Sequence, residues 1–461
     1  MERLKPMDAQ FIDAEDQDAH ASFAIASIAI FEGPPPSYDD FLSAVAGRLP
    51  DIPIYRRKLR TVPLRLGPPV WVDDPEFDLR YHVRQTALPP PGGDSELQAL
   101  VARVMGQRLD RDYPLWEFWL VQGLSGGRWA LVSKVHHAMI DGVAGIDLYR
   151  LMFDATPETA ASAAGTCNAG EQPSALTLAV QAAAEMMLLP AKTVLALAAA
   201  AARPERSIRQ LRRTARATAR LAAAAWPAAS SSLSGPIGRQ RRYAWSRASL
   251  TDVKEIKRAL GGTVNDVVLA AISSGFRALL VHRGEDPKPH MVPSLIPVSM
   301  RAPGEQSILD NRVSVLVADL PVHIADPVEQ LEFIKAEMSE LKAVREATAA
   351  EALITLGRFT PYPIASRVVR LGYRLPQHEI VTVTTNVPGP GVPSYAMGRR
   401  LLEMIPYVPI ATTLRTGVSI FSYCDQLTFG ITADYASTPD IDVLVRGIEV
   451  GVRELQQAAL R

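Results

Sequence analysis

The sequence predicts a mixed α/β fold in which two lobes are joined by a helical connector. The chain has 461 residues, too many for one ordinary hydrophobic core, so two domains plus connections are expected. Each half combines short apolar runs typical of strands with segments whose apolar residues recur at helical spacing. After Pro157, alanine, serine and glycine dominate to about Ser234. We therefore divide the chain into an N-terminal lobe (1–157), a connector (158–234) and a C-terminal lobe (235–461).

The N-terminal lobe alternates predicted strands and helices. Apolar runs predict one strand at 23–31 and another at 129–135, and residues 56–83 mix short strands with Pro and Gly turns. Apolar residues at helical spacing predict three helices, at 38–49, 96–109 and 143–153.

The connector is expected to form two Ala-rich helices, at 174–202 and 206–225. A membrane span needs about 20 mainly apolar residues. The first helix is interrupted by polar residues and a proline, so we expect that it does not cross a membrane; these residues are Gln181, Glu185, Pro190 and Lys192.

The second connector helix carries the one strong local charge bias of the chain, with almost no acids. Its basic residues are Arg209, Arg212, Arg213, Arg216 and Arg220. One interpretation is a solvated helical connector. The other is a helix that lies on an anionic membrane surface and is attracted through its arginines.

The C-terminal lobe begins with two helices that have clear boundary signals. The helix at 251–260 is stopped by two glycines, and Thr263 can cap the next helix, which runs to about His282. Asp326, followed by Pro and then Glu, marks a further helix start. Strands are expected at 380–385, 417–423 and 427–434, the last two as a hairpin.

Composition excludes several classes of protein. The hydrophobic fraction of 48% and the charged fraction of 21% are those of a globular protein. Lys+Arg 49 balances Asp+Glu 49, so no global field attracts nucleic acid, and none is expected as a partner. Cys167 and Cys424 cannot form a disulfide framework, and the N-terminus lacks the apolar core of a signal peptide. These features predict a cytoplasmic protein.

The motif His136-His137-Ala-Met-Ile-Asp141-Gly142 follows the strand predicted at 129–135. Histidine is the usual general base near neutral pH, and a strand end presents side chains to a cleft on a rigid support. Asp141 could orient a ring or fix the loop, and Gly142 permits unusual backbone angles. A single histidine is more often a hydrogen-bonded core residue, but the full motif is much more specific. Zinc binding is not expected, because no third His or Cys ligand stands nearby.

With this motif, the chain resembles the bacterial wax ester synthase/acyl-CoA:diacylglycerol acyltransferases, within the wider superfamily of CoA-dependent acyltransferases. HHxxxDG alone supports only the superfamily. The narrower resemblance rests on further blocks in the expected order, which are MERLKPMDAQFIDAE, LDR followed by PLWE, TVNDV, PVSMR and TNVPGP. One departure is Asp310-Asn311, where Gly-Asn is expected, and it puts only local turn geometry in doubt.

The resemblance implies two chloramphenicol-acetyltransferase-like lobes and an O-acyltransferase. Such an enzyme moves a long-chain acyl group from acyl-CoA, its co-substrate, to diacylglycerol or a long-chain alcohol. No cofactor and no metal are expected. Two alternatives are a condensation-type acyltransferase with a carrier-bound donor and a catalytically idle lipid-surface protein. The PLW and ND blocks argue against the first, and the intact HHxxxDG motif argues against the second.

The resemblance also implies roles for individual residues. It assigns the general base to His137 and supporting roles to His136, Asp141 and Gly142. Asn265, in the first turn of a predicted helix, is a candidate to stabilise the oxyanion, since free backbone N–H groups and the positive helix dipole lie there. Asp266 is a candidate for substrate binding, or else only a favourable charge at the helix start.

For the remaining candidate residues, only their position in the sequence supports a functional role. Pro114, Leu115 and Trp116 are core residues or wall residues of an acyl tunnel, which could hold a chain at about 0.8 kcal/mol for each buried methylene. Arg301 is a possible partner for Asp141 across the two lobes, since a buried carboxylate needs one. The expected location is peripheral, on an anionic inner membrane face or on lipid droplets.

Overall fold

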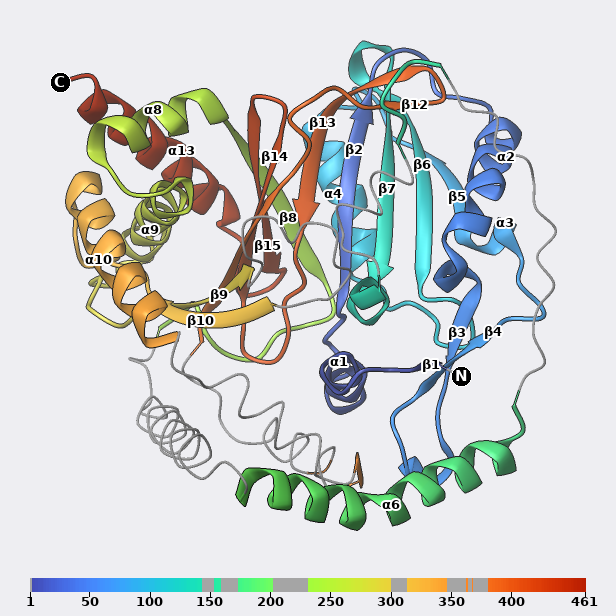
Figure 1. Cartoon of the computed structure of the whole chain (residues 1–461). Helices are drawn as coiled ribbons and strands as arrows, with labels where there is room; N and C mark the ends of the chain where they lie inside the picture. Colours follow the sequence, from blue (N-terminus) through green and yellow to red (C-terminus); the bar gives the residue numbers. More distant parts are fainter. Residues whose placement is uncertain are drawn as a thin grey trace.

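In the part of the chain that the structure describes, the strands form two six-stranded sheets and one small three-stranded sheet (Figure 1). The mixed α/β fold expected from the sequence is therefore confirmed. The computed structural model describes residues 2–142, 153–158, 173–201, 231–299, 313–345, 362–363, 367 and 380–461. The helices predicted at 143–153 and 206–225 lie wholly or almost wholly outside these residues, and the lobe boundaries at 157 and 234 stay predictions.

The N-terminal sheet has the catalytic-motif strand at its centre. Its order is β12 (Tyr395–Ala396), β13 (Arg399–Tyr407), β2 (Ala24–Phe31), β7 (Arg128–His136), β6 (Trp116–Leu124) and β5 (Val83–Ala87). The strands predicted from apolar runs are β2 and β7, which pair antiparallel. Both are almost fully buried, which is why they show continuous apolar sequence and not alternation.

Helices α2 (Tyr38–Arg48) and α4 (Asp94–Met105) flank this sheet where helical spacing predicts helices. The short helix α3 (Leu79–His82) lies in the stretch 56–83, for which the sequence predicted short strands and turns and no helix. The side chain of Ser37 caps α2 by accepting the Asp40 N–H. At the C-terminal end of α4, the buried ammonium of Lys134 on β7 donates to the Val104 and Gln107 carbonyls. A side chain of the sheet therefore provides hydrogen bonds to carbonyls at the end of the helix.

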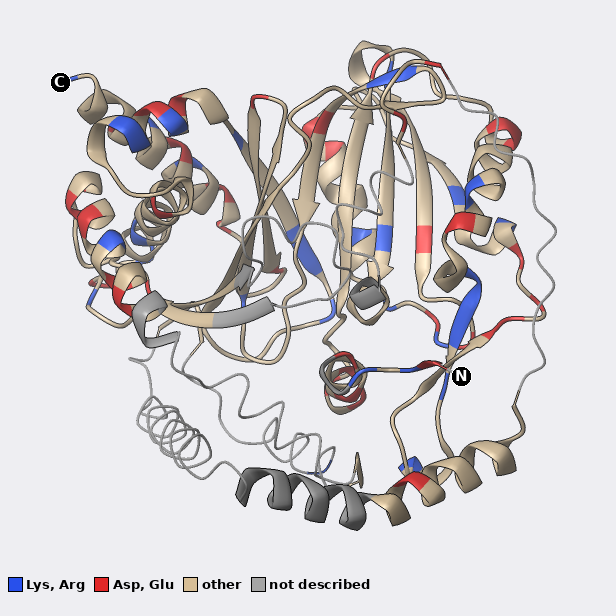
Figure 2. Cartoon of the chain, viewed as in Figure 1, with Lys and Arg blue, Asp and Glu red and all other residues tan. Residues whose placement is uncertain are grey.

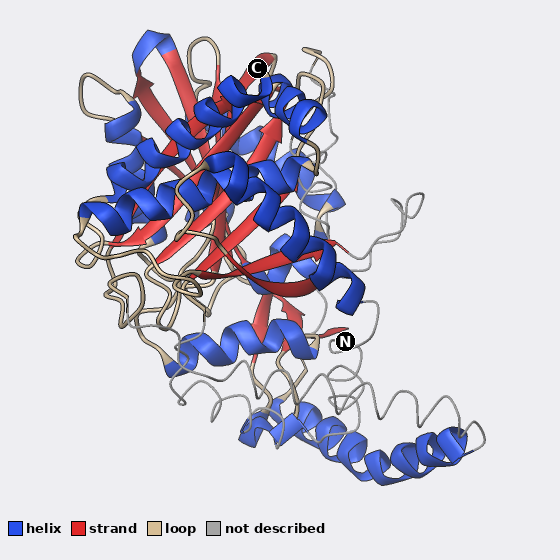
Figure 3. Ribbon diagram, turned by 90° about the vertical axis from the view of Figure 1, so that its left-hand side faces the viewer, coloured by secondary structure: helices blue, strands red, loops and turns tan. Residues whose placement is uncertain are grey.

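The C-terminal sheet is covered by a layer of helices on one face (Figure 3). Its order is β10 (Val313–Asp319), β9 (Pro293–Ser299), β11 (Thr382–Pro388), β14 (Thr416–Tyr423), β15 (Gln426–Asp434) and β8 (Arg241–Ser249). The helices are α8 (Leu250–Leu260), α9 (Val264–His282), α10 (Pro327–Arg345) and α13 (Ile441–Ala459). Among the described helices, α9 is apolar and long enough to cross a membrane, but 67% of its apolar window is buried inside the protein.

The boundary signals read from the sequence are confirmed in this lobe. Thr263 Oγ1 accepts the Asp266 N–H at 3.2 Å, and Asp266 Oδ2 accepts the Thr263 N–H at 2.8 Å, which is a reciprocal capping box. Gly261 ends α8 at φ 80°, a backbone angle that favours glycine. Asp326 caps α10 through the Val328 N–H at 2.8 Å. The predicted hairpin is β14 and β15.

The underside of the molecule combines the small sheet with two helices. The sheet order is β1 (Glu2–Arg3), β4 (Val70–Asp73) and β3 (Arg57–Arg60). Helix α1 (Pro6–Gln17), which sequence analysis did not identify, lies beside the end of β7, and α6 (Ala175–Ala201) runs along the bottom of Figure 1. Leu178 and Ala182 of α6 pack on an apolar cluster formed by Val62, Val70 and Val72.

Two strands from the second half of the chain join the sheet of the N-terminal lobe and so connect the two lobes. Strands β12 and β13 come late in the chain, yet β13 pairs antiparallel with β2, so that Ile405 faces Ile28. At the far end of β13, the Pro406 carbonyl accepts hydrogen bonds from Tyr243 Oη at 2.6 Å and from Ser419 Oγ at 3.0 Å. The backbone of one sheet is therefore bonded directly to side chains of the other.

This junction requires a glycine at position 430, on β15. A Cβ there would overlap the Pro406 carbonyl oxygen and lie 2.9 Å from Tyr243 Oη. We expect Gly430→Ala to destabilise the junction by about 1 to 3 kcal/mol, since overpacking forces backbone shifts. Gly391→Ala is the matched control, because a Cβ at Gly391 meets nothing within 4 Å. Calorimetry should show a lower melting temperature only for Gly430→Ala, and equal melting temperatures would contradict the role of this contact.

Candidate active site

The HHxxxDG motif begins at the end of β7 and continues as a 3₁₀ turn, η5 (His137–Gly142). Neighbouring backbone holds this strand end from both sides. The His136 N–H donates to the Leu115 carbonyl at 2.9 Å, and the His137 N–H donates to the Phe23 carbonyl at 2.9 Å. Because successive side chains of an extended segment point to opposite sides, the two histidines enter different surroundings.

His136 is a buried, fully oriented ring. Its Nδ1 accepts the Ala138 N–H at 3.1 Å, so the ring proton is on Nε2. Nε2 lies 3.2 Å from Glu15 Oε1, although the N–H direction departs from a straight hydrogen bond. With both nitrogens occupied in this way, and with 2% of its surface exposed, His136 is placed to support the loop and not to exchange protons with a substrate.

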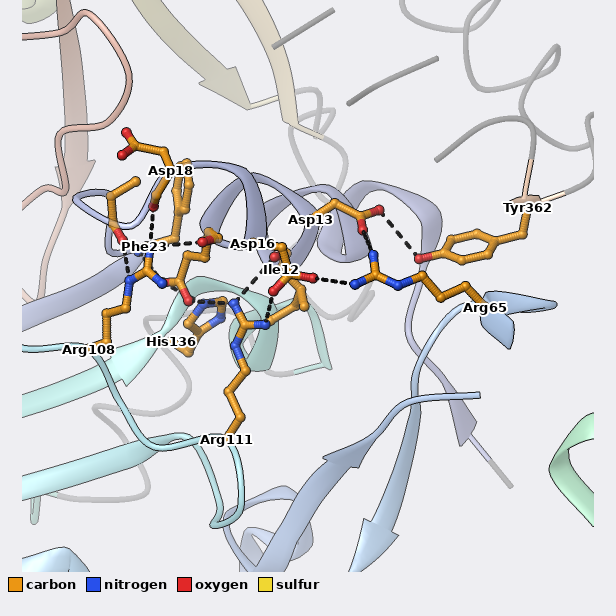
Figure 4. Close-up of polar contacts among 12 residues, drawn as sticks. Ile12, Asp13, Asp16, Asp18, Phe23, Arg65, Arg108, Arg111, His136 and Tyr362 are labelled. Carbon is orange, nitrogen blue, oxygen red and sulfur yellow. Dashed lines mark hydrogen bonds and ion pairs between the residues drawn. The ribbon is translucent and has the colours of Figure 1, made fainter. Parts of the chain in front are cut away.

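Three donors surround the buried carboxylate of Glu15, and Figure 4 labels the residues that provide them, Phe23, Arg111 and His136. Besides His136, its carboxylate accepts the Phe23 N–H at 2.7 Å and Arg111 Nη2 at 2.9 Å. Burial alone raises the pKa of Glu15, but the contacts with His136, Arg111 and the Phe23 N–H outweigh burial and lower the pKa to about 2. Glu15 is therefore an anion at every working pH.

His137 is half-buried, and its ring packs on Phe11 of α1 with the ring centroids 4.3 Å apart. Phe11 and Glu15 are four residues apart and so lie on one face of α1. One helix face thus meets both histidines of the motif. Phe11 contacts the ring of His137, and Glu15 contacts the ring of His136.

Asn265 lies in the first turn of α9, as the sequence predicted, and is half-buried. Asn386 Nδ2 on β11 donates to Asn265 Oδ1 at 3.4 Å. This contact occupies the acceptor end of the Asn265 amide and leaves its NH₂ end as the donor that could face an oxyanion. Asn386 belongs to the TNVPGP block, to which the sequence alone attached no role.

Other candidates take structural positions. Trp116 and Leu115 are fully buried, and Trp116 Nε1 donates to the Tyr55 carbonyl at 2.7 Å while its ring stacks on His82 at 4.5 Å. Pro114 is buried as well. These are core contacts, and through the Leu115 carbonyl this block also holds His136. A tunnel-wall role stays a prediction.

Asp266 is buried and engaged in the capping box of α9, and its substrate-binding role also stays a prediction. The side chain of Asp141 and all of Arg301 lie outside the described residues, so the pair expected between them is untested. Gly142 is the last residue of η5, and its supporting role stays a prediction. No group of three metal-ligating side chains occurs among the described residues.

The sequence did not single out Phe11, Glu15, Arg111 or Asn386 as site residues. Phe11 and Glu15 fall in the N-terminal block, and Arg111 falls in the LDR block. The four-residue spacing of Phe11 and Glu15 is a signal for a shared helix face. No local pattern shows that this face meets residues 136 and 137.

A mixed two-lobed fold with HHxxxDG at a strand end defines an acyltransferase of the CoA-dependent type, and solved structures agree with this class. A wax ester synthase/diacylglycerol acyltransferase from Marinobacter aquaeolei VT8 is 26% identical, with a TM-score of 0.70 over 100% of both chains. The first condensation domain of the calcium-dependent antibiotic synthetase shares the fold at 17% identity, with a TM-score of 0.61 over 99% of this chain and 96% of that one.

The chain belongs to the wax ester synthase/diacylglycerol acyltransferase family. The family's catalytic domain matches residues 4–268, and its C-terminal domain matches residues 309–456. A probable diacylglycerol O-acyltransferase of Mycobacterium tuberculosis is 39% identical over 456 residues, which cover 99% of this chain and 96% of the relative. A putative diacylglycerol O-acyltransferase of the same species is 33% identical, over 99% of this chain and 91% of the relative.

The pKa of Glu15 makes a prediction about acid stability. A carboxyl whose pKa falls from 4.5 to about 2 on folding contributes about 3 kcal/mol above pH 4.5, and loses this contribution as the pH falls toward 2. Glu15→Gln should therefore unfold at lower denaturant concentration at pH 7, and its deficit against the wild type should shrink between pH 4.5 and 2. Guanidinium titrations across this range measure both, and a constant deficit would contradict the assignment.

Proposed function

We propose that this enzyme transfers a long-chain acyl group from acyl-CoA to the hydroxyl of diacylglycerol and so makes triacylglycerol, with fatty alcohols as a second class of acceptor. The observation that carries the proposal is the division of work between the two histidines. His136 is locked by Glu15 and Ala138, whereas His137 is half-buried against Phe11 at the end of β7. Family membership and the names of the relatives support the substrate class.

The chemistry needs one base and one oxyanion donor. The His137 imidazole takes the proton of the acceptor hydroxyl as that oxygen attacks the thioester carbonyl. The tetrahedral oxyanion is stabilised by the NH₂ of Asn265, which Asn386 orients. When the C–S bond breaks, the imidazolium returns its proton to the CoA thiolate, and the new C–O bond remains in the ester. No covalent enzyme intermediate, metal or cofactor enters these steps.

An acceptor panel tests this function. Purified enzyme is incubated with palmitoyl-CoA and with diolein, hexadecanol or no acceptor, and the ester and free CoA are measured. His137→Ala should lower turnover about 100- to 10,000-fold while the protein stays folded, because a positioned acid–base group contributes that much. Absence of ester with every acceptor would overturn the function, and near-normal turnover of His137→Ala would overturn the mechanism.

We further propose that the enzyme works as a peripheral protein on the inner face of the cell membrane or on lipid droplets, because its acceptor is a lipid. The arginine cluster predicted for this contact, residues 209–220, lies outside the described residues. Support comes from α6, whose outward side chains are apolar and exposed: Leu176 at 74%, Val180 at 58% and Met187 at 81%. These residues lie opposite the face that packs through Leu178 and Ala182.

The surroundings of α6 fit a lipid surface. The part of α6 whose side chains are described has Glu185 as its one charged residue, and Figure 2 shows it almost free of charge. Leu64, in the neighbouring turn η3 (Pro63–Arg65), is 89% exposed at a positive φ of 53°, which is a costly conformation for leucine. The next residue, Arg65, pairs with Asp16 on α1 at 3.2 Å, so this apolar surface adjoins the helix that contacts both histidines.

Vesicle binding tests the contact. Leu176→Ser combined with Met187→Ser should weaken binding to vesicles that contain phosphatidylglycerol and diolein by about tenfold, because about 1.4 kcal/mol of apolar burial is lost. The matched control is Val281→Ser combined with Leu460→Ser, since these side chains are also exposed, at 54% and 79%, but lie in the C-terminal lobe. Equal binding of both double variants would leave α6 a simple connector.

A further inference from the structure

Glu15 reaches His137 along two separate routes. In the first route, its carboxylate accepts the Phe23 N–H at 2.7 Å, and the carbonyl of the same Phe23 accepts the His137 N–H at 2.9 Å. In the second route, the carboxylate lies 3.2 Å from His136 Nε2, and His136 Nδ1 accepts the Ala138 N–H. Residues on both sides of His137, and the backbone of His137 itself, are therefore tied to one carboxylate.

The environment of Glu15 holds it in place. Its side chain is 3% exposed, and Arg108 Nη2 donates to its backbone carbonyl at 2.8 Å. The ionisable groups near it come from two neighbouring segments. They are His136 and Lys134 on β7, and Arg111 and Arg108 between α4 and β6, while Asp16 on α1 pairs with the same Arg111. The two arginines fix the helix and the carboxylate separately, so Glu15 has little freedom to turn away from the strand end.

We propose that Glu15 is a positioning residue for acyl transfer, which orients the base His137 by holding both His136 and Phe23. The inference rests on the function proposed above. The carboxylate performs no proton transfer. It keeps the proton of His136 on Nε2, so that Nδ1 can hold the turn that follows His137, and it fixes the carbonyl to which the backbone of His137 is bonded. A misplaced base loses rate because proton transfer needs hydrogen-bond geometry.

The proposed role requires both the charge and the length of the Glu15 side chain. Glutamine keeps the length but loses the charge, and an inward-facing NH₂ group would meet the N–H donors of Phe23, Arg111 and His136. Aspartate keeps the charge but is one methylene shorter, so it cannot reach all three donors from the same helix position. The two variants therefore separate electrostatic orientation from simple packing.

Steady-state kinetics with palmitoyl-CoA and diolein test the proposal. Glu15→Gln should lower kcat by about 10- to 100-fold, since small misplacements of a base have effects of this size, while KM for palmitoyl-CoA stays within about twofold because no substrate contact is lost. Glu15→Asp should recover part of the lost kcat. A double-mutant cycle with His136→Gln should be strongly non-additive, because Glu15 acts in part through His136.

A pH profile separates this role from a purely structural one. Removal of the negative charge of Glu15 favours the neutral form of the His137 imidazole. The acid limb of the kcat/KM profile should therefore move to lower pH by about half a unit in Glu15→Gln. Asp440→Asn is the matched control. It breaks a partly buried pair with Arg283 at the start of α13, and should cost stability without moving the acid limb.

The outcomes are distinct. If the wild type makes no ester with any acceptor, the proposed function fails. If the wild type is active and Glu15→Gln keeps kcat within twofold, or if the two substitutions are additive and the acid limb does not move, the positioning role fails. Should Glu15→Gln not fold, Glu15→Asp and its cycle with His136→Gln decide the matter. Full kcat in Glu15→Asp, or an additive cycle, would overturn the proposal.

Discussion

The buried carboxylate of Glu15 is the contact on which the geometry of the active site depends. It joins the N-terminal helix to the strand that ends in the two histidines, and it brings Arg111 into the same cluster. A buried anion is tolerated only when donors surround it, and Glu15 has an arginine, a backbone N–H and a ring N–H. Because of this cluster, the orientation of the motif depends on the position of α1.

The second constraint is strand β13, which comes from the second half of the chain and pairs in the sheet of the N-terminal lobe. This strand completes the sheet that carries His136, while its Pro406 carbonyl is bonded to Tyr243 and Ser419 of the other lobe. Arg247 on β8 adds a pair to Glu403 on β13 at 2.6 Å, buried on the Glu403 side. Relative motion of the lobes must break these bonds, so His137 and Asn265 are presented from two supports that are firmly joined.

Helix α1 connects the two motif histidines with the surroundings of the exposed apolar face of α6. One face of this helix touches both histidines. Its acids Asp13 and Asp16 pair with Arg65 (Figure 4). Arg65 follows the exposed Leu64 in η3, which contacts α6. Tyr362 also donates to Asp13 at 3.4 Å, which brings a residue from the second half of the chain to the same helix. Under the proposed peripheral location, a lipid acceptor delivered at α6 would arrive next to the helix that contacts both histidines.

The sequence by itself determined the features that depend on neighbouring residues. The strand before His136, the capping box of Thr263 and Asp266, and the β14–β15 hairpin all follow from local periodicity, capping and turn chemistry. Only the tertiary structure decided that Glu15 meets His136, that Asn386 holds Asn265 from 121 positions away, and that β13 joins the opposite lobe. These contacts depend on how distant segments pack together, and a hydrogen-bonding side chain carries no local mark of its distant partner.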